Sequence, residues 1–165
     1  MKKATCFFCY AWDTDERYKQ LDFLRNKIEV ESNGLVQVIL DKHSYEINAD
    51  FDKLRRKIEK YDLVVVFCTP DLKQIVLDRN SKRNKDREVL KEYDIIKKRF
   101  ELNNSSVFPL ILEGDKENAL LELFSSKIVI NLGDFEMYKN KRVFQGKRKS
   151  LLIILQVSFP ILSKS

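Results

Sequence analysis

The sequence has few glycines and no glycine-rich loop. Only four of its 165 residues are glycine, and none of them belongs to a G-x-G-x-x-G or Walker pattern. Those loops cradle phosphates because glycine lets the backbone come close to the ligand. Their absence argues against nucleotide binding by a glycine-rich turn. The sequence also lacks a G-x-S-x-G elbow, which argues against an α/β-hydrolase.

Histidine and cysteine are scarce and are not arranged as a metal site. The single histidine, His43, has no cysteine or histidine near it in the sequence, so it is a poor metal ligand. Cys6 and Cys9 have C-x-x-C spacing, but residues three apart on a strand point to opposite faces of a sheet. We therefore expect no metal, and we predict buried free thiols in a reducing compartment.

No apolar run is long enough to cross a bilayer. Residues 151–162 are apolar, but they are only about a dozen positions long, against roughly 20 for a membrane-spanning helix. The run that follows Met1, Lys2 and Lys3 is too short and too interrupted for a signal peptide. We expect a soluble, cytoplasmic protein with no membrane partner.

The positive charge is concentrated near the C-terminus. The chain has a net charge of +6, and the basic residues that account for it lie between positions 139 and 149. The rest of the chain is roughly balanced. We interpret this stretch as a solvated basic segment, dispensable for chemistry, with contact to nucleic acid or anionic lipid as the alternative.

Short apolar runs alternate with amphipathic segments along the chain. Residues 63–68, LVVVFC, are apolar throughout, and Thr69-Pro70 ends the run. A run this short and apolar is typical of a strand buried on both faces, so we place it at the centre of a parallel sheet. Other strands are expected at residues 4–10, 35–40, 107–112 and 127–132, with Gln37 marking an edge strand and Pro109 lying inside the fourth strand.

Helical periodicity fills the segments between these strands. The first helix is expected to begin at Asp13 or Thr14 and to end at Asn33-Gly34. Residues 78–87 are polar throughout and predict an exposed loop or a frayed helix. Further helices are expected around residues 51–58, 72–77, 89–100, 117–124 and 146–159.

This alternation predicts an α/β fold. We expect one domain over residues 1–165, with a core at about 3–133, followed by the basic segment and a closing helix at about 134–165. The expected architecture is a flavodoxin-like three-layer sandwich with a five-stranded parallel sheet in the order 2-1-3-4-5. In that order the loops after Tyr10 and Cys68 face one crevice, and the loop at 41–50 flanks it.

The residues expected at this crevice are aromatic and acidic. Tyr10, Trp12 and Asp13 follow the first strand, and Glu92 lies on the helix after the third strand. A tryptophan at a strand end more often packs than binds a ligand, and a glutamate on a charged helix usually faces solvent. A phosphorylatable receiver domain is disfavoured, because Cys68 stands where that class needs an aspartate.

Five segments together resemble bacterial TIR (Toll/interleukin-1 receptor) domains. Residues 8–13, FCYAWD, resemble the opening F-I-S-Y-S-W-D, and residues 38–41, VILD, resemble the second strand and the aspartate after it. Residues 62–70, DLVVVFCTP, resemble the third strand, which often ends in T-P. Residues 89–94, VLKEYD, are similar to G-V-x-x-E-[SY], and residues 107–111, VFPLI, to the following I-P-[VL]-[IL] strand. The resemblance covers about residues 3–133.

The resemblance implies an NAD+ glycohydrolase or cyclase that releases nicotinamide and ADP-ribose or a cyclic variant, with NAD+ as substrate and no cofactor. It implies that Glu92 is the catalytic carboxylate. It also implies bacterial antiphage signalling, self-association through TIR–TIR contacts and a partner effector protein. The substrate-binding residues that it implies are Tyr10, Ala11, Trp12, Asp13, Asp41 and Thr69.

The chemistry of an N-glycosidic bond agrees with a carboxylate at position 92. Breaking this bond builds positive charge on the ribose, as in an oxocarbenium-like glycosidase transition state, and a nearby carboxylate stabilises that charge. The sequence departs from the family in the loops. The family's serine is replaced by Cys9 and Ala11, the usual glycine of the second-strand loop is absent, and Leu90 stands two residues before Glu92. The alternative function is therefore a non-catalytic interaction module that self-associates through the loop at 41–50.

Overall fold

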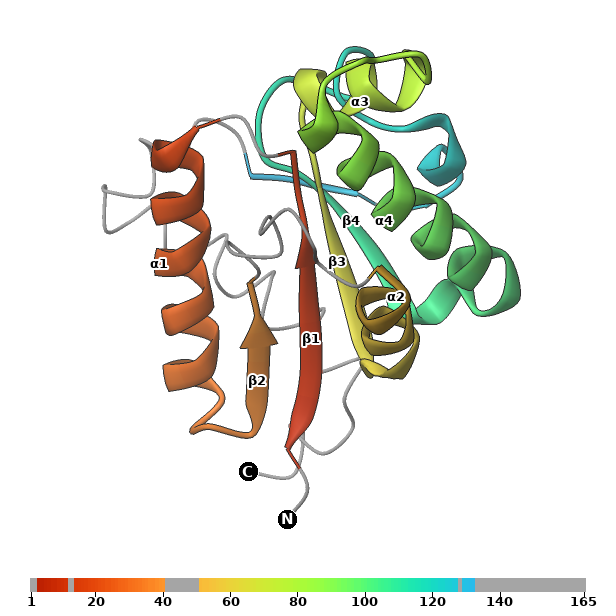
Figure 1. The fold of residues 1–165 in the computed structure, drawn as a ribbon. Helices are drawn as coiled ribbons and strands as arrows, with labels where there is room; N and C mark the ends of the chain where they lie inside the picture. The colour runs from red at the N-terminus through yellow and green to blue at the C-terminus, as the bar shows by residue number, and fades with distance from the viewer. Residues whose placement is uncertain (1–2, 12–13, 41–50, 128, 133–165) are drawn as a thin grey trace.

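The computed structural model describes residues 3–11, 14–40, 51–127 and 129–132 (Figure 1). Several predictions concern positions outside these ranges. They are the roles of Trp12, Asp13, Asp41 and His43, the loop at 41–50, the basic segment and the closing helix.

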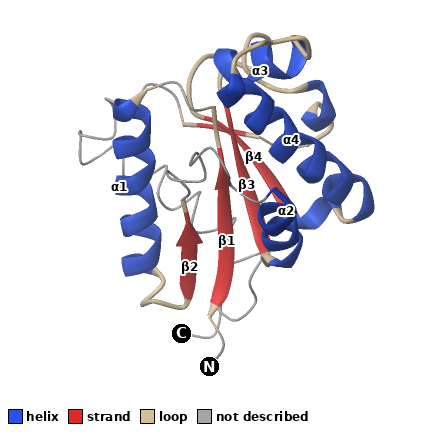
Figure 2. Ribbon diagram, in the orientation of Figure 1, coloured by secondary structure: helices blue, strands red, loops and turns tan. Residues whose placement is uncertain are grey.

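Five parallel strands form one sheet in the order β2-β1-β3-β4-β5 (Figure 2). This order confirms the flavodoxin-like topology predicted from the sequence. Each strand lies within the range expected for it. Their bounds are β1 Ala4–Cys9, β2 Val36–Ile39, β3 Leu63–Cys68, β4 Val107–Ile111 and β5 Ile130–Asn131.

The strand β3 is central, as its apolar run predicted. No residue of Leu63–Cys68 is more than 2 % exposed. Its register places Leu63 opposite Cys6 of β1 on one side and Val64 opposite Val107 of β4 on the other. A strand paired on both edges and covered on both faces has no position for a polar side chain. By contrast, Gln37 is exposed on the edge strand β2, as expected.

Helices cover both faces of the sheet and complete the three layers (Figure 1). The helix α1 (Asp15–Glu31) packs on one face, while α2 (Phe51–Lys60), α3 (Pro70–Leu77) and α4 (Asn84–Leu102) lie on the other. Alternate residues along the strands belong to two separate cores, one on each face of the sheet. Cys6 belongs to the α1-side core and Cys9 to the opposite one, so the prediction that this pair is split between faces is confirmed.

The ends of α1 are set by local sequence. Thr14 is the N-cap, and its side chain accepts a hydrogen bond from the backbone N–H of Arg17 at 3.1 Å. At the other end Asn33 and Gly34 have φ values of 50° and 73°. These left-handed residues end the helix, which confirms the prediction at both ends.

Two expectations for shorter elements are wrong in detail, and a third is confirmed in part. The polar stretch at 78–87, expected as an exposed loop or a frayed helix, is a loop up to Arg83 and becomes helical at Asn84, where α4 begins. The helix expected at 117–124 is a turn followed by a 3-10 segment, Glu122–Phe124. The Asp115 carboxylate accepts hydrogen bonds from the backbone N–H groups of residues 117 and 118, which favours a tight turn over a helix. The strand β5 is also shorter than its apolar run.

The sheet accommodates Pro109 inside β4. Pro109 pairs with Val66 of β3, whereas β5 pairs with β4 only at Leu110 and Ile111. Within the described strands, β4 therefore has a neighbour on one side only at position 109. Proline lacks a backbone N–H and is tolerated at such an edge-like position.

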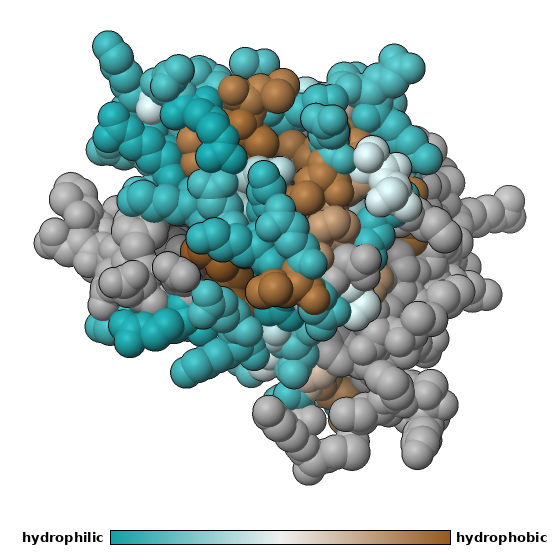
Figure 3. All heavy atoms as spheres, turned by 90° about the vertical axis from the view of Figure 1, so that its right-hand side faces the viewer, coloured by the Kyte–Doolittle hydropathy of each residue, from teal (hydrophilic) through white to brown (hydrophobic). Residues whose placement is uncertain are grey.

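The side of the molecule formed by α2, α3 and α4 is mainly hydrophilic, with smaller apolar areas between the charged side chains (Figure 3). Within the described part of the chain, no helix is both long and apolar enough to cross a membrane.

Candidate functional site

Glu92 lies on the inward face of α4. The buried residues of this helix include Val89, Glu92 and Ile96, which recur at helical spacing, and Glu92 is 2 % exposed. This corrects the expectation that a glutamate on a charged helix faces solvent. Apart from the buried Asp86, the other charged positions of α4 are exposed or half-buried, and position 92 falls on the stripe that packs against the sheet.

The carboxylate of Glu92 contacts the end of β1. The thiol of Cys9, the last residue of β1, forms a hydrogen bond with it. Burial raises the pKa of the Cys9 thiol, and the Glu92 charge, nearby Cys68 and this hydrogen bond raise it further. The thiol therefore stays protonated and donates to the carboxylate. The structure thus brings Glu92 to the carboxyl end of the central strands, where the topology predicted a crevice.

The two described residues after β1 point to different sides of the sheet. Tyr10 is 5 % exposed and belongs to the α1-side core, whereas Ala11 is 2 % exposed and belongs to the core beneath α3 and α4. Ala11 is therefore on the same side as Glu92, and Tyr10 is on the other. The substrate-binding roles of both residues stay predictions.

Thr69 has a structural partner at the start of α3. It is 1 % exposed, and its hydroxyl accepts a hydrogen bond from the backbone N–H of Leu72 at 3.1 Å. Pro70 follows at the first helical position, where its missing N–H leaves no bond unmade. Thr69 therefore caps α3, and its predicted contact with substrate stays a prediction.

A cavity of about 260 Å³ lies beside this group of residues. Ala11 from the end of β1, Ile75 from α3 and Val89 from α4 contribute apolar side chains to it. Val89 lies one helical turn before Glu92, which does not itself line the cavity. Residues one turn apart on a helix are neighbours, so Glu92 lies next to a residue of the cavity lining.

The polar lining of the cavity comes from α3, from the connection after it and from the first turn of α4. The sequence had predicted only an exposed loop or a frayed helix for residues 78–87 of this region. The mixture of acidic and basic residues at 78–87 was the only sequence feature that could have indicated this polar lining. The lining includes Asp71, Asp78, Arg83, Lys85 and Asp86.

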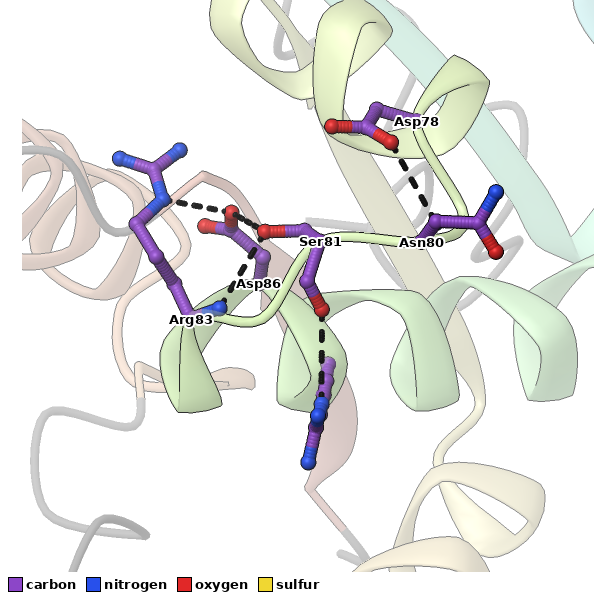
Figure 4. A network of polar contacts seen from close by, with 6 residues as sticks. Asp78, Asn80, Ser81, Arg83 and Asp86 are labelled. Atoms are coloured by element: carbon purple, nitrogen blue, oxygen red, sulfur yellow. Dashed lines mark hydrogen bonds and ion pairs between the residues drawn. The ribbon is translucent and has the colours of Figure 1, made fainter.

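Asp86 organises the start of α4 (Figure 4). One of its carboxylate oxygens, Oδ2, accepts hydrogen bonds from the Ser81 hydroxyl at 2.6 Å and from Nε of Arg83 at 2.7 Å. Burial raises the pKa of Asp86, but these two hydrogen bonds, with the charges of Arg83 and Lys85, outweigh it and bring the pKa below its usual value. Asp86 is therefore ionised at neutral pH.

Metal-ligating side chains do not gather in the part of the chain that the structure describes. No group of three or more histidine, cysteine, aspartate or glutamate residues there could hold a metal ion. The candidate site among the described residues is therefore the Glu92 carboxylate with its Cys9 partner, next to a cavity with carboxylates.

This fold, a five-stranded parallel sheet with helices on both faces, is TIR-like. No family model matches the sequence, and no curated protein matches it. A solved structure that it resembles is that of a prokaryotic SEFIR domain, at 19 % sequence identity and a TM-score of 0.65, covering 89 % of this chain and 91 % of that one. At this identity the likeness shows the fold alone, and it does not assign the chain to bacterial TIR domains.

Proposed function

We propose that this chain is a TIR/SEFIR-type domain that cleaves NAD+ at the bond between nicotinamide and ribose, and that it does so as an assembly. The observation that carries the proposal is the position of Glu92, a carboxylate only 2 % exposed at the carboxyl end of the central strands. The resemblance of residues 89–94 to the segment that holds the glutamate of bacterial TIR domains supports it.

Burying a carboxylate lowers the stability of a protein, so a buried carboxylate on a surface helix suggests a functional role. Removing a charge from water is unfavourable, and Asp94 and Glu101 of the same helix avoid this by staying half-buried or exposed. Glu92 instead faces the sheet, next to the Cys9 thiol. Buried ionisable groups in such places are candidates for functional sites. In open α/β sheets the carboxyl ends of the strands at the switch point are where ligands bind.

The carboxylate has a defined role in the reaction. As the C–N bond breaks, its electron pair leaves with the nicotinamide ring nitrogen, and positive charge builds on the ribose. The negative Glu92 stabilises that charge, more strongly in a buried site than in water. Water then bonds to the ribose carbon and loses a proton, which gives ADP-ribose. In a cyclase, a nitrogen of the adenine ring replaces water as the nucleophile.

The burial of Glu92 explains why assembly is part of the proposal. Glu92 is 2 % exposed and does not line the cavity, so it meets no substrate in this conformation. If self-association opens the site at the carboxyl end of the strands, turnover will depend on protein concentration. Such control suits a signalling domain, and the antiphage role implied by the TIR resemblance is proposed with it.

The burial of Glu92 also favours one other function. If the site never opens, the bond between Glu92 and Cys9 only joins α4 to β1. The chain is then a non-catalytic module that acts by self-association. This function predicts no NAD+ turnover in any assembled state.

Replacing Glu92 by glutamine tests the proposal. Glu92→Gln keeps the shape of the side chain and loses its charge, so nicotinamide release from NAD+ is expected to fall by about 10²-fold or more. The assay follows nicotinamide by chromatography across a range of protein concentrations and with crowding agents that promote assembly. Because position 92 is buried, thermal unfolding of the variant is measured alongside.

Glu88→Gln is the matched control. Glu88 lies on the same helix and forms an ion pair with Lys91 at 3.4 Å, and it does not align with the family glutamate. Its turnover should equal that of the wild type. Equal loss in both variants would show that the site is assigned to the wrong residue. Absence of wild-type turnover in every assembled state would leave the interaction module as the function.

A further inference from the structure

The cavity beside Glu92 has an acidic lining. Three carboxylates, Asp71, Asp78 and Asp86, line it together with two basic side chains, Arg83 and Lys85. The guanidinium of Arg83 is paired with Asp86 through its Nε at 2.7 Å. The formal charge of the lining is therefore negative, so the cavity favours a cationic ligand over an anionic one.

Asp86 carries an oxygen that lacks a donor. Its Oδ1 is buried and accepts no hydrogen bond within the described ranges, while Oδ2 accepts two. Figure 4 shows Oδ1 on the side of the carboxylate turned away from Ser81. An ionised carboxylate accepts at both oxygens, and leaving a buried one unsatisfied is unfavourable. A ligand with an N–H group in the cavity would satisfy it.

The size of the cavity limits what it can hold. Its volume is about 260 Å³. A cavity of about 150 Å³ accommodates benzene, so this one has room for a single six-membered ring with a small substituent. Sites for whole drug-sized ligands are roughly 300–1,000 Å³. A complete dinucleotide therefore does not fit, but one end of it does.

We infer that this cavity binds the nicotinamide ring of NAD+, with the carboxamide N–H donating to Oδ1 of Asp86. This inference rests on the proposed function. The ring of NAD+ is a pyridinium cation, which the carboxylates attract, and Ala11, Ile75 and Val89 supply apolar surface for it. Val89 lies one turn from Glu92, so a ring held here places the scissile bond toward the catalytic carboxylate. The diphosphate of NAD+ would be repelled by the same lining.

The charge of the cavity acts on binding more than on the chemical step. The ring is cationic in NAD+ and neutral once released, so attraction to the carboxylates holds the substrate and then disappears in the product. Interactions that favour the bound substrate lower KM without raising kcat. The same lining discriminates against NADH, whose ring is neutral.

Substrate analogues test this inference. Nicotinic acid adenine dinucleotide replaces the carboxamide with a carboxylate, which would face Asp86 without an N–H to donate. We expect the wild type to prefer NAD+ over this analogue by about 100-fold in kcat/KM. Asp86→Asn offers an amide N–H in place of a carboxylate oxygen, so the preference should fall to within about tenfold, as the analogue becomes acceptable.

A second variant and a control separate recognition from folding. Asp86 also holds the loop before α4, so Asp86→Asn is checked by thermal unfolding, and the exposed Asp71 is changed to asparagine as well. Asp71→Asn should raise KM for NAD+ severalfold without lowering kcat. Asp94→Asn is the control. Asp94 is on the same helix, paired with Arg79 at 2.8 Å, and it does not line the cavity, so this variant should change neither value.

A binding measurement keeps this inference distinguishable from the proposed function. The 1-methylnicotinamide cation, neutral nicotinamide and nicotinate are titrated into the intact protein and followed by NMR at Ala11 and Val89. We expect the cation to bind more tightly than nicotinamide and nicotinate not to bind. In Asp86→Asn these differences in affinity should disappear. This result without NAD+ turnover would support the cavity assignment and overturn the proposed function. Turnover without discrimination between the dinucleotides, or failure of the cation to bind, would overturn the cavity assignment.

Discussion

Arg99 connects three segments of the described chain through hydrogen bonds of its guanidinium. From the last turn of α4, its Nη1 donates to the carbonyl of Ile58 at 2.7 Å, and Nη2 donates to those of Tyr61 and Asp62 at 2.6 and 3.1 Å. Its Nε donates to the Ser106 hydroxyl at 2.9 Å. These acceptors lie at the end of α2, before β3 and before β4. Burial lowers the pKa of Arg99, but arginine remains charged in proteins.

Arg99→Lys should destabilise the protein by roughly 2–3 kcal/mol, because one ammonium cannot satisfy acceptors spread around a planar guanidinium. Urea unfolding followed by circular dichroism measures this. Arg79→Lys is the control, since Arg79 makes a two-contact pair with Asp94 at the surface, where such a pair contributes about 1 kcal/mol or less. Equal losses in the two variants would contradict the role given to Arg99.

At the scale of the elements, α1 and α3 begin with the same cap in different surroundings. Thr14 and Thr69 each accept a backbone hydrogen bond at 3.1 Å. Thr14 is exposed, whereas Thr69 is 1 % exposed. Water can replace the lost partner at an exposed helix start but not at a buried one.

Thr69→Ala should therefore cost about 2 kcal/mol, and Thr14→Ala about 0.5–1 kcal/mol, within the range for N-cap removal. Thr69→Ser should restore most of the loss, because serine keeps the accepting hydroxyl. Chemical denaturation of the three variants measures these differences. If Thr69 also binds substrate, KM for NAD+ will rise in Thr69→Ala. An unchanged KM would show that Thr69 only caps α3.

At the scale of the whole molecule, the cysteines report on both cores at once. All three are free and buried, Cys6 on the α1 side of the sheet, Cys9 and Cys68 on the other. Burial raises the pKa of each thiol, that of Cys68 to about 12. A thiol that is protonated and inaccessible does not react as a nucleophile.

We expect Ellman's reagent at pH 8 to label none of the three cysteines in the native protein and all three in urea. Because the cores share one sheet, all three should become reactive together as the protein unfolds. A raised pKa in the folded state means that only the unfolded chain ionises at about pH 8.5, so the free energy of unfolding should decrease above that pH. A cysteine that reacts in native buffer would show that one face opens separately.

Features that depend on residues adjacent along the chain were determined by the sequence alone. The apolar run of residues 63–68 predicted the central strand, because only a strand paired and covered on all sides tolerates it. Gln37 marked the edge strand, and Thr14 with Asn33-Gly34 marked the ends of α1. Strands that alternate with helices and have short connections then predicted the flavodoxin-like strand order.

The site depended on contacts between distant segments, which only the tertiary structure decides. A helix carrying charges on most of its surface does not reveal which turn faces the sheet, so the burial of Glu92 and Asp86 was not predicted. The cavity is lined by the end of β1, by α3 and by the start of α4, and no local pattern encodes its volume or its charge. The sequence determined the order of the elements. The packing of α3 and α4 against β1 determined which carboxylates are buried together, because burial depends on neighbours in space and not on neighbours along the chain.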